Sequence, residues 1–129
     1  MKKPVVMDVD GTLTSERYDE SNLLSIRENP VMILLALSLQ DKHPLLVSTA
    51  RPEYLRPQTE AWLAKHGLVP EKIYMRPNDQ EGAPDPEIKF AHLQDIRREY
   101  SNPQVWCDDN DANVAMLQDN NVPVIHVKQ

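Results

Sequence analysis

The chain has 129 residues, of which 40% are hydrophobic, and its formal net charge is −6. This length allows one compact domain, residues 1–129, and is too short for two independent hydrophobic cores. The negative charge excludes the broad basic surface that tracks a nucleic-acid duplex, so any nucleic-acid substrate would have to be gripped locally.

The sequence contains no recognisable secretory or membrane-spanning segment. The apolar stretch after Met1 is only about five residues long before Asp8 interrupts it, which is unlike a signal peptide. The longest apolar run, Val31–Leu39, is roughly half the length that crosses a bilayer. Cys107 is the single cysteine and cannot form an internal disulfide, as is typical of a reducing compartment. We therefore expect a cytoplasmic protein without membrane contact.

Apolar runs, capping residues and helix stops predict an alternation of strands and helices. A buried strand over 4–7 leads into the polar sequence Asp8-Val9-Asp10-Gly11, and Asn29-Pro30 is typical of a helix start. The other predicted strands are 44–49, 72–75, 104–107 and 123–127, and the predicted helices cover about 31–39, 57–66, 85–100 and 112–119. This alternation predicts an α/β fold whose parallel sheet is covered on both faces, with ligands bound at the carboxyl ends of the strands.

The predicted helix over 31–39 is apolar around much of its circumference. We expect it to be sandwiched, because a helix that is apolar on most sides needs a partner on more than one of them. The alternative is that part of this helix forms the contact surface of a homodimer.

Asp8 and Asp10 place two carboxylates where a buried strand opens to solvent, and Gly11 then permits a tight turn. A carboxylate can attack phosphorus and form an aspartyl phosphate. A second carboxylic acid two residues further on can protonate the leaving oxygen and then activate water as a base. The alternative interpretation is an Asp-Gly turn with a solvated partner, but the other acidic residues of the chain favour the catalytic one.

Asp108 and Asp109 form a second acidic pair, at the end of the fourth predicted strand. Adjacent carboxylates disfavour each other's charged forms unless a cation lies between them. Their hard oxygen ligands indicate Mg²⁺, held by Asp8, Asp10, Asp108 and Asp109. We expect Asp109 to be the direct ligand of the later pair and Asp108 to support it; a polar loop is the alternative.

Thr49 and Lys89 are the candidate donors to a phosphoryl group. The negative charge on the equatorial oxygens of a phosphoryl group in transfer requires donors besides the metal. Thr49 ends a predicted strand and offers a hydroxyl and a backbone N–H, whereas Lys89 lies in the first turns of a helix that could face the same crevice. Arg51 and Arg76 follow strands and could clamp a phosphate through bidentate hydrogen bonds, with surface salt bridges as the alternative.

With these residues in this order, the chain resembles the haloacid dehalogenase (HAD) superfamily of hydrolases over nearly its whole length. The first motif is matched by Asp8-Val9-Asp10-Gly11-Thr12-Leu13-Thr14, the second by Thr49, the third by Lys89 and the fourth by Asp108-Asp109. The resemblance implies a three-layer Rossmann-like fold with a central, mostly parallel five-stranded sheet, a Mg²⁺ cofactor and Asp8 as the nucleophile. The intervals between the motifs hold only a loop and a helix each, so we expect no sizeable cap domain.

More narrowly, three segments are similar to the 3′-phosphatase domain of phage-type polynucleotide kinase. They are 47–51, 74–76 and 85–89. This resemblance implies that Arg51 and Asp85 support phosphate binding and that Arg17 contacts the substrate. Asn110 stands where an arginine often follows the paired aspartates of that family. These 129 residues contain no Gly-x-x-x-x-Gly-Lys-Ser/Thr loop, so we expect no kinase half within them.

The resemblance predicts a phosphomonoester hydrolase that acts on the 3′-phosphate of a nucleic-acid end or a nucleotide and contributes to nucleic-acid repair. If the chain is encoded by a phage, its location would be the host cytoplasm. A 5′-nucleotidase or general small-molecule phosphatase is the nearest alternative. A phosphoaspartate receiver module is a further alternative, although receivers carry their acidic pair early in the chain. A non-catalytic binding module is disfavoured because Asp8 and Asp10 are both present.

Overall fold

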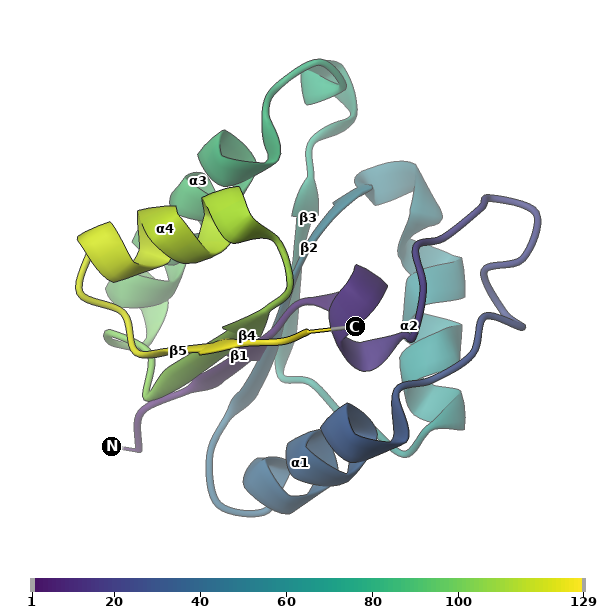
Figure 1. The fold of residues 1–129 in the computed structure, drawn as a ribbon, viewed down its shortest axis with the longest axis horizontal. Helices are drawn as coiled ribbons and strands as arrows, with labels where there is room; N and C mark the ends of the chain where they lie inside the picture. Colours follow the sequence, from purple (N-terminus) through teal and green to yellow (C-terminus); the bar gives the residue numbers. More distant parts are fainter. Residues whose placement is uncertain (1, 129) are drawn as a thin grey trace.

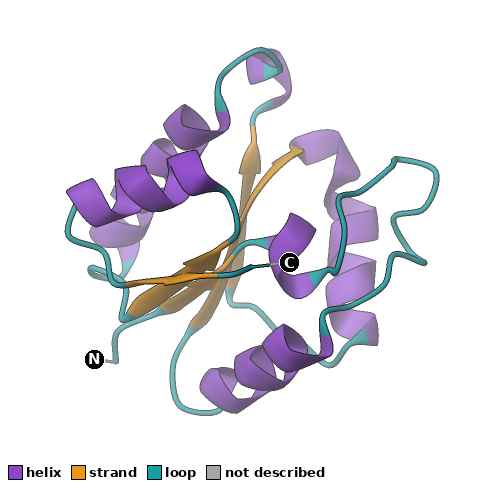
Figure 2. Cartoon of the chain, in the orientation of Figure 1, coloured by secondary structure: helices purple, strands orange, loops and turns teal. Residues whose placement is uncertain are grey.

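The computed structural model describes residues 2–128 and has a five-stranded, all-parallel sheet at its centre (Figure 1; Figure 2). The strand order is β3-β2-β1-β4-β5. The strands are β1 (Val5–Met7), β2 (Leu45–Pro52), β3 (Lys72–Arg76), β4 (Val105–Asp108) and β5 (Val124–His126). This architecture confirms the predicted α/β, Rossmann-like fold.

Two layers of helices enclose the sheet. The helices α1 (Pro30–Gln40) and α2 (Arg56–Lys65) lie on one side, and α3 (Asp85–Glu99) and α4 (Asp111–Asp119) lie on the other (Figure 1). Three short helical turns complete the described structure, η1 (Val9–Leu13), η2 (Glu53–Leu55) and η3 (Asn78–Gln80). The described segments between the motifs add α1 before Thr49, and α2, β3 and two short turns before Lys89, and they contain no cap domain, as predicted. None of the described helices has the length and apolar character needed to cross a bilayer.

Alternating side chains of the central strands divide the hydrophobic core into two parts, because successive residues of a strand point to opposite faces. Val5 and Met7 pack in the cluster that contains Trp62 and other residues of the α1 and α2 layer. Val6 packs in the cluster on the other face, with residues of α3 and α4 such as Leu93. All three residues of β1 are fully buried, so this strand is the best protected element of the sheet.

The order of the strands creates a crevice next to β1. The chain runs outward from β1 to β2 and β3, then returns to form β4 and β5 on the other side of β1. Met7 pairs with Cys107, and the Asp8 N–H donates to the Cys107 carbonyl at 3.0 Å. Asp8 and Asp108 therefore leave two neighbouring strands at the same level, at the switch point where α/β proteins bind ligands.

Strand β2 continues past the predicted end at residue 49 to Pro52. Pro52 pairs with Arg76 of β3 after a shift in register that begins beyond Ser48. Arg51 consequently lies on a strand rather than in a loop, and its backbone is held by the sheet.

Helix α1 differs from the expectation that it would be sandwiched. Met32, Ile33 and Ala36 are buried, but Val31 is 73% and Leu34 is 66% exposed. The reason is that α1 forms the outermost layer on its side, and no other described element covers its outer face. The homodimer through 31–39 has no support from this exposure alone and stays a prediction.

The orientation of α1 predicts that two neighbouring truncations have unequal effects. Ile33→Ala removes a buried side chain and should lower the free energy of unfolding by about 2–5 kcal/mol. Leu34→Ala, the matched control, removes a side chain that is 66% exposed and should change it by less than about 0.5 kcal/mol. Urea unfolding of both variants measures the difference; equal destabilisation would contradict the observed rotation of the helix.

Candidate active site

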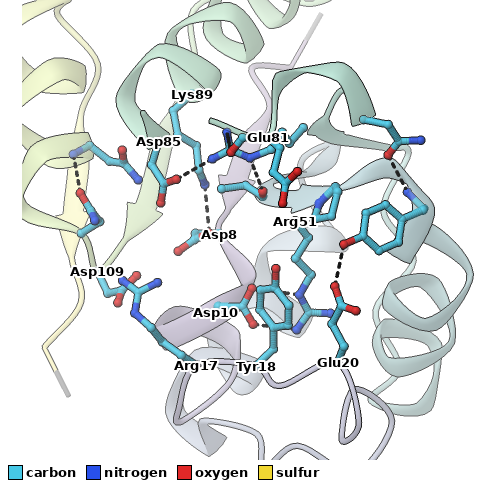
Figure 3. A pocket seen from close by; sticks show the side chains of 17 residues that line it. Asp8, Asp10, Arg17, Tyr18, Glu20, Arg51, Glu81, Asp85, Lys89 and Asp109 are labelled. Atoms are coloured by element: carbon cyan, nitrogen blue, oxygen red, sulfur yellow. Dashed lines mark hydrogen bonds and ion pairs between the residues drawn. The ribbon is translucent and has the colours of Figure 1, made fainter. Parts of the chain in front are cut away.

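A cavity of about 440 Å³ opens at the carboxyl ends of the central strands and gathers most of the predicted site residues (Figure 3). Its lining consists of Asp8, Asp10, Arg17, Tyr18, Glu20, Ala50, Arg51, Pro52, Tyr54, Arg76, Asn78, Glu81, Asp85, Lys89, Asp109, Asn110 and Asn113. Of the ten residues that the sequence singled out, Thr49 and Asp108 are not in this lining. Both are fully buried.

Lys89 provides the positive charge at the base of the cavity. Its ammonium group donates to Asp8 Oδ1 at 2.9 Å and to the Ser48 carbonyl at 2.6 Å, and it lies 3.3 Å from Asp108 Oδ2. Burial lowers the pKa of Lys89, but the charges of Asp108 and Asp8 outweigh this effect and raise the pKa above its usual value. Lys89 therefore stays cationic and joins β1, β2 and β4 from its position on α3.

Asp8, Asp108 and Asp109 form the group that could hold a metal ion within residues 2–128. Each offers a carboxylate oxygen, and these oxygens lie within 4.8 Å of one another. Burial raises the pKa of Asp8 well above its usual value, and Asp108 adds to this effect while Lys89 opposes it. Three carboxylates face one ammonium group here, so a divalent cation would balance the buried charge. The all-oxygen donor set fits Mg²⁺.

The two members of the late acidic pair have different surroundings. Asp108 accepts hydrogen bonds from the Asn110 N–H at 3.0 Å and from the Asn113 amide at 3.4 Å. Asp109 faces the turn after β1, where the Thr12 hydroxyl lies 3.5 Å from its Oδ1. The cavity thus reaches Asp109, whereas Asp108 is fully buried outside its lining. The prediction that Asp109 is the direct ligand and Asp108 its support stays a prediction.

Gly11 allows this close approach between the two ends of the chain. Its φ is +80°, a conformation that side-chain-bearing residues rarely adopt. A Cβ atom at this position would lie 2.7 Å from Asp109 Cγ, and closer still to one of the Asp109 carboxylate oxygens. Gly11 is therefore needed both for the turn and for the space that Asp109 occupies.

Asp10 is separated from the metal-binding group, because both of its carboxylate oxygens are engaged by Arg51. The Arg51 Nε–H and one terminal N–H donate to Asp10 at 2.9 and 2.7 Å, in a bidentate pair. A further Arg51 N–H donates to the Thr59 hydroxyl at 3.0 Å, and the Tyr18 ring covers the guanidinium at 4.9 Å. Arg51 is 1% exposed, so the pair holds Asp10 in a defined position.

Arg76 organises the segment between β3 and α3. It donates to the carbonyls of Ala50 (2.9 Å), Gln80 (2.8 Å) and Ala83 (2.6 Å). It also forms an ion pair with Asp85 at 2.7 Å. Because these contacts use four of the five guanidinium N–H groups, one N–H is left for a ligand.

Thr49 is fully buried outside the cavity lining, and its hydroxyl accepts a hydrogen bond from the backbone N–H of Arg51 at 3.2 Å. The preceding residue, Ser48, points to the opposite face of β2 and lies 2.7 Å from His92 Nδ1. His92 Nε2 lies 3.0 Å from the Met75 carbonyl, which can only accept, so Nε2 carries the proton and Ser48 donates to Nδ1. This chain of contacts fixes α3, and with it Lys89, against β2 and β3.

Sequence reasoning missed several residues of the cavity. These are Tyr18, Glu20, Tyr54, Asn78, Glu81, Asn110 and Asn113. One signal was available, because Asn110 directly follows the acidic pair and Asn113 lies about one helical turn after Asn110. The others lie in loops or short helical turns without a recognisable pattern, and only the folded chain brings them together.

Known proteins resemble this chain in sequence and in structure. A family model described as the polynucleotide kinase PNKP phosphatase domain matches residues 2–129. Among curated proteins, none matches the chain.

Solved structures share the fold at low sequence identity. A chain of a Pnkp1/Rnl/Hen1 complex superposes with a TM-score of 0.85 at 22% identity, over 98% of this chain and 46% of that one. A chain of the Pnkp1/Rnl/Hen1 RNA repair complex gives 0.85 at 21% identity, over 98% and 42%. D,D-heptose 1.7-bisphosphate phosphatase from B. bronchiseptica, crystallised with magnesium and phosphate, gives 0.64 at 16% identity, over 96% and 79%. The chain spans less than half the length of the first two.

His92 predicts a dependence of stability on pH. Burial, assisted by the charge of Lys89, lowers the pKa of His92 from 6.5 to about 4. As the pH falls, the unfolded chain therefore binds this proton before the folded chain does. The contribution of neutral His92 to the free energy of unfolding is complete above pH 6.5 and is lost between pH 6.5 and about 4.

Replacement of His92 by a residue that does not titrate tests this effect. In His92→Gln, the free energy of unfolding should fall less steeply as the pH is lowered over this range. The total fall should be smaller than that of the wild type by on the order of 2–3 kcal/mol. Urea unfolding at a series of pH values measures it. Parallel pH profiles for the two proteins would contradict the lowered pKa.

Proposed function

Because the chain belongs to the family of polynucleotide kinase PNKP phosphatase domains, we propose that it removes 3′-phosphates from polynucleotide ends or nucleotides. The chain is a phosphatase of the HAD type. We further propose that it depends on Mg²⁺, forms an aspartyl-phosphate intermediate and acts on a phosphate at the 3′ position. The observation that carries it is the arrangement of Asp8 and Asp10, with Asp8 next to Lys89 and Asp10 held by Arg51 at one cavity.

Asp8 is the nucleophile of the proposed reaction. Lys89 engages its Oδ1, while its Oδ2 lies 3.3 Å from the Thr12 hydroxyl. A carboxylate oxygen of Asp8 attacks phosphorus, the bond from phosphorus to the ester oxygen breaks, and an aspartyl phosphate forms. Lys89 stabilises the negative charge of the transferring group because it stays cationic in this buried position.

Asp10 moves the protons. It gives a proton to the leaving ester oxygen, and in the second step it takes one from the water that attacks the aspartyl phosphate. That step releases inorganic phosphate and restores Asp8. Arg51 holds both oxygens of Asp10 and so keeps this group at a fixed distance from the nucleophile.

Mg²⁺ would be held by Asp8, Asp108 and Asp109, and it would supply charge neutralisation for the phosphate oxygens. The related heptose bisphosphate phosphatase was crystallised with magnesium and phosphate, which supports this choice. The Asp10 carboxylate, which the sequence predicted as a fourth ligand, is instead engaged by Arg51 and lies outside this group.

The 3′-nucleic-acid substrate is supported by the RNA repair complex that contains a similar chain. The absence of a cap domain also favours a phosphate at the end of a polymer, since such a site is open to large substrates. Arg17, Arg76 and Asp85, which line the cavity, are the proposed substrate contacts beside Arg51. We further propose a cytoplasmic location.

A substrate panel tests the proposal. With Mg²⁺, a 3′-phosphorylated oligonucleotide and a nucleoside 3′-monophosphate should be hydrolysed with a higher kcat/KM than 5′-mononucleotides, and chelation by EDTA should remove the activity. The measurement is the rate of inorganic phosphate release. Faster turnover of 5′-mononucleotides would instead favour a 5′-nucleotidase or general phosphatase. A phosphoprotein that persists for hours would favour a receiver-like module.

The roles of the first acidic pair predict different defects. Asp8→Asn removes the nucleophile and should lower kcat by at least about 10³-fold. Asp10→Asn should slow both formation and hydrolysis of the phosphoenzyme, by about 10²–10⁴-fold. The exposed Asp119→Asn is the matched control and should retain full activity. Near-normal turnover of Asp8→Asn, with a native circular dichroism spectrum, would exclude this mechanism.

A further inference from the structure

The outer part of the catalytic cavity is lined by residues that the proposed reaction does not use. They are Tyr18, Glu20, Tyr54, Asn78 and Glu81. They come from separate segments of the chain: the loop between β1 and α1, the turn η2, and η3 with the residue that follows it. A substrate that places its phosphate next to Asp8 would present its leaving group to this outer part.

Tyr54 is an exposed aromatic residue that is nevertheless held in place. It is 57% exposed. Its hydroxyl donates to Glu20 Oε1 at 2.7 Å, and its backbone N–H donates to Asn78 Oδ1 at 3.1 Å. Contacts at both ends of the residue orient the ring without covering it. Binding of a flat group to this ring costs less conformational entropy than binding to a mobile side chain, because the tyrosine is already ordered.

Tyr18 has a different role, because its ring packs over the Arg51 guanidinium at 4.9 Å. Figure 3 shows Tyr18 across the Asp10–Arg51 pair, where it forms the wall between this pair and the outer cavity. Tyr54 is therefore the aromatic residue of the cavity with the larger exposed surface for a substrate.

The charges of the outer cavity disfavour a second phosphate. Glu20 and Glu81 line it and are exposed. Three of the four basic residues in the lining, Arg51, Arg76 and Lys89, are buried and paired with carboxylates. The fourth, Arg17, is exposed and lies on the side of Asp109 in Figure 3, away from Glu20.

A polynucleotide backbone would need a row of exposed cations beside the catalytic cavity, since each bound phosphate is neutralised by lysine or arginine. The lining instead offers one exposed arginine, two exposed glutamates and an oriented tyrosine. This combination suits an uncharged flat group next to the reacting phosphate.

We propose that Tyr54 stacks on the base of the terminal nucleotide, so that the cavity recognises one phosphate and one nucleoside rather than the polynucleotide backbone. This inference rests on the proposed function, because it takes a nucleotide as the substrate. Stacking tolerates every base, since each has a π face, and the subsite should therefore show little preference among the four bases.

The experiment compares a substrate with a base and one without. For Tyr54→Ala, kcat/KM for a nucleoside 3′-monophosphate should fall roughly tenfold, mainly through a higher KM. For β-glycerophosphate, which has no ring, it should change by less than about twofold. Tyr54→Phe keeps the ring and loses the hydrogen bond to Glu20, so it is the matched control and should retain most of the preference for the nucleotide.

A binding measurement gives a readout that does not depend on turnover. In the Asp8→Asn background, calorimetric titration with the nucleoside 3′-monophosphate should give a Kd that is roughly tenfold weaker when Tyr54→Ala is added. An unchanged Kd, or an equal loss of kcat/KM for both substrates, would overturn the subsite while leaving the phosphatase assignment intact. Hydrolysis of β-glycerophosphate but of no 3′-nucleotide would overturn the proposed function itself.

Substrates of different length test whether the cavity recognises a single nucleotide rather than the polynucleotide backbone. The values of kcat/KM for 3′-phosphorylated mono-, di- and hexanucleotides should agree within about threefold and depend weakly on salt, because few phosphates are bound. A rise of more than about tenfold with length, lost at high salt, would show that this chain binds the backbone and would overturn the proposal.

Discussion

The site depends on one constraint: the buried negative charge at the carboxyl end of β1 must be balanced by positive charge. The register of β1 with β4 brings Asp8 and Asp108 to one level, and both are largely removed from water. Lys89 offsets part of their charge from α3. A buried charge without a partner is costly, so the ion pairs of Lys89 on α3 and the proposed divalent cation would answer the same electrostatic requirement.

Several features away from the carboxylates maintain this arrangement. His92 lies one turn after Lys89 on α3 and joins Ser48 to the Met75 carbonyl, which fixes the helix against two strands. Arg76 gathers three carbonyls and Asp85, and so gives the β3–α3 segment a defined shape. Both residues are buried and polar. His92 positions Lys89 from outside the cavity lining, whereas Arg76 lines the cavity and keeps one N–H for a ligand.

The two halves of the cavity have different chemistry. Its base carries ion pairs that suit a phosphate and a metal ion, whereas its outer part carries Tyr54 between Glu20 and Asn78. The base contains the side chains that the proposed cleavage of a phosphomonoester uses. The outer part distinguishes one leaving group from another, and it comes from loops whose positions depend on the rest of the fold.

The pattern of the sequence alone determined the fold class and the edge of the sheet at which the cavity lies. Alternation of apolar runs and helix signals predicted the parallel sheet, and the two acidic pairs at strand ends predicted where its site lies. These features are local, since strand periodicity, helix caps and adjacent carboxylates can be recognised within a few residues.

Only the tertiary structure decided how those residues are used. It directs the carboxylate of Asp10 to Arg51 rather than to the metal-binding group, exposes Val31 and Leu34 on α1, and assembles the outer cavity around Tyr54. These outcomes depend on contacts between segments far apart in the chain. Burial and pairing of a side chain are set by the elements that pack beside it, and no local pattern encodes them.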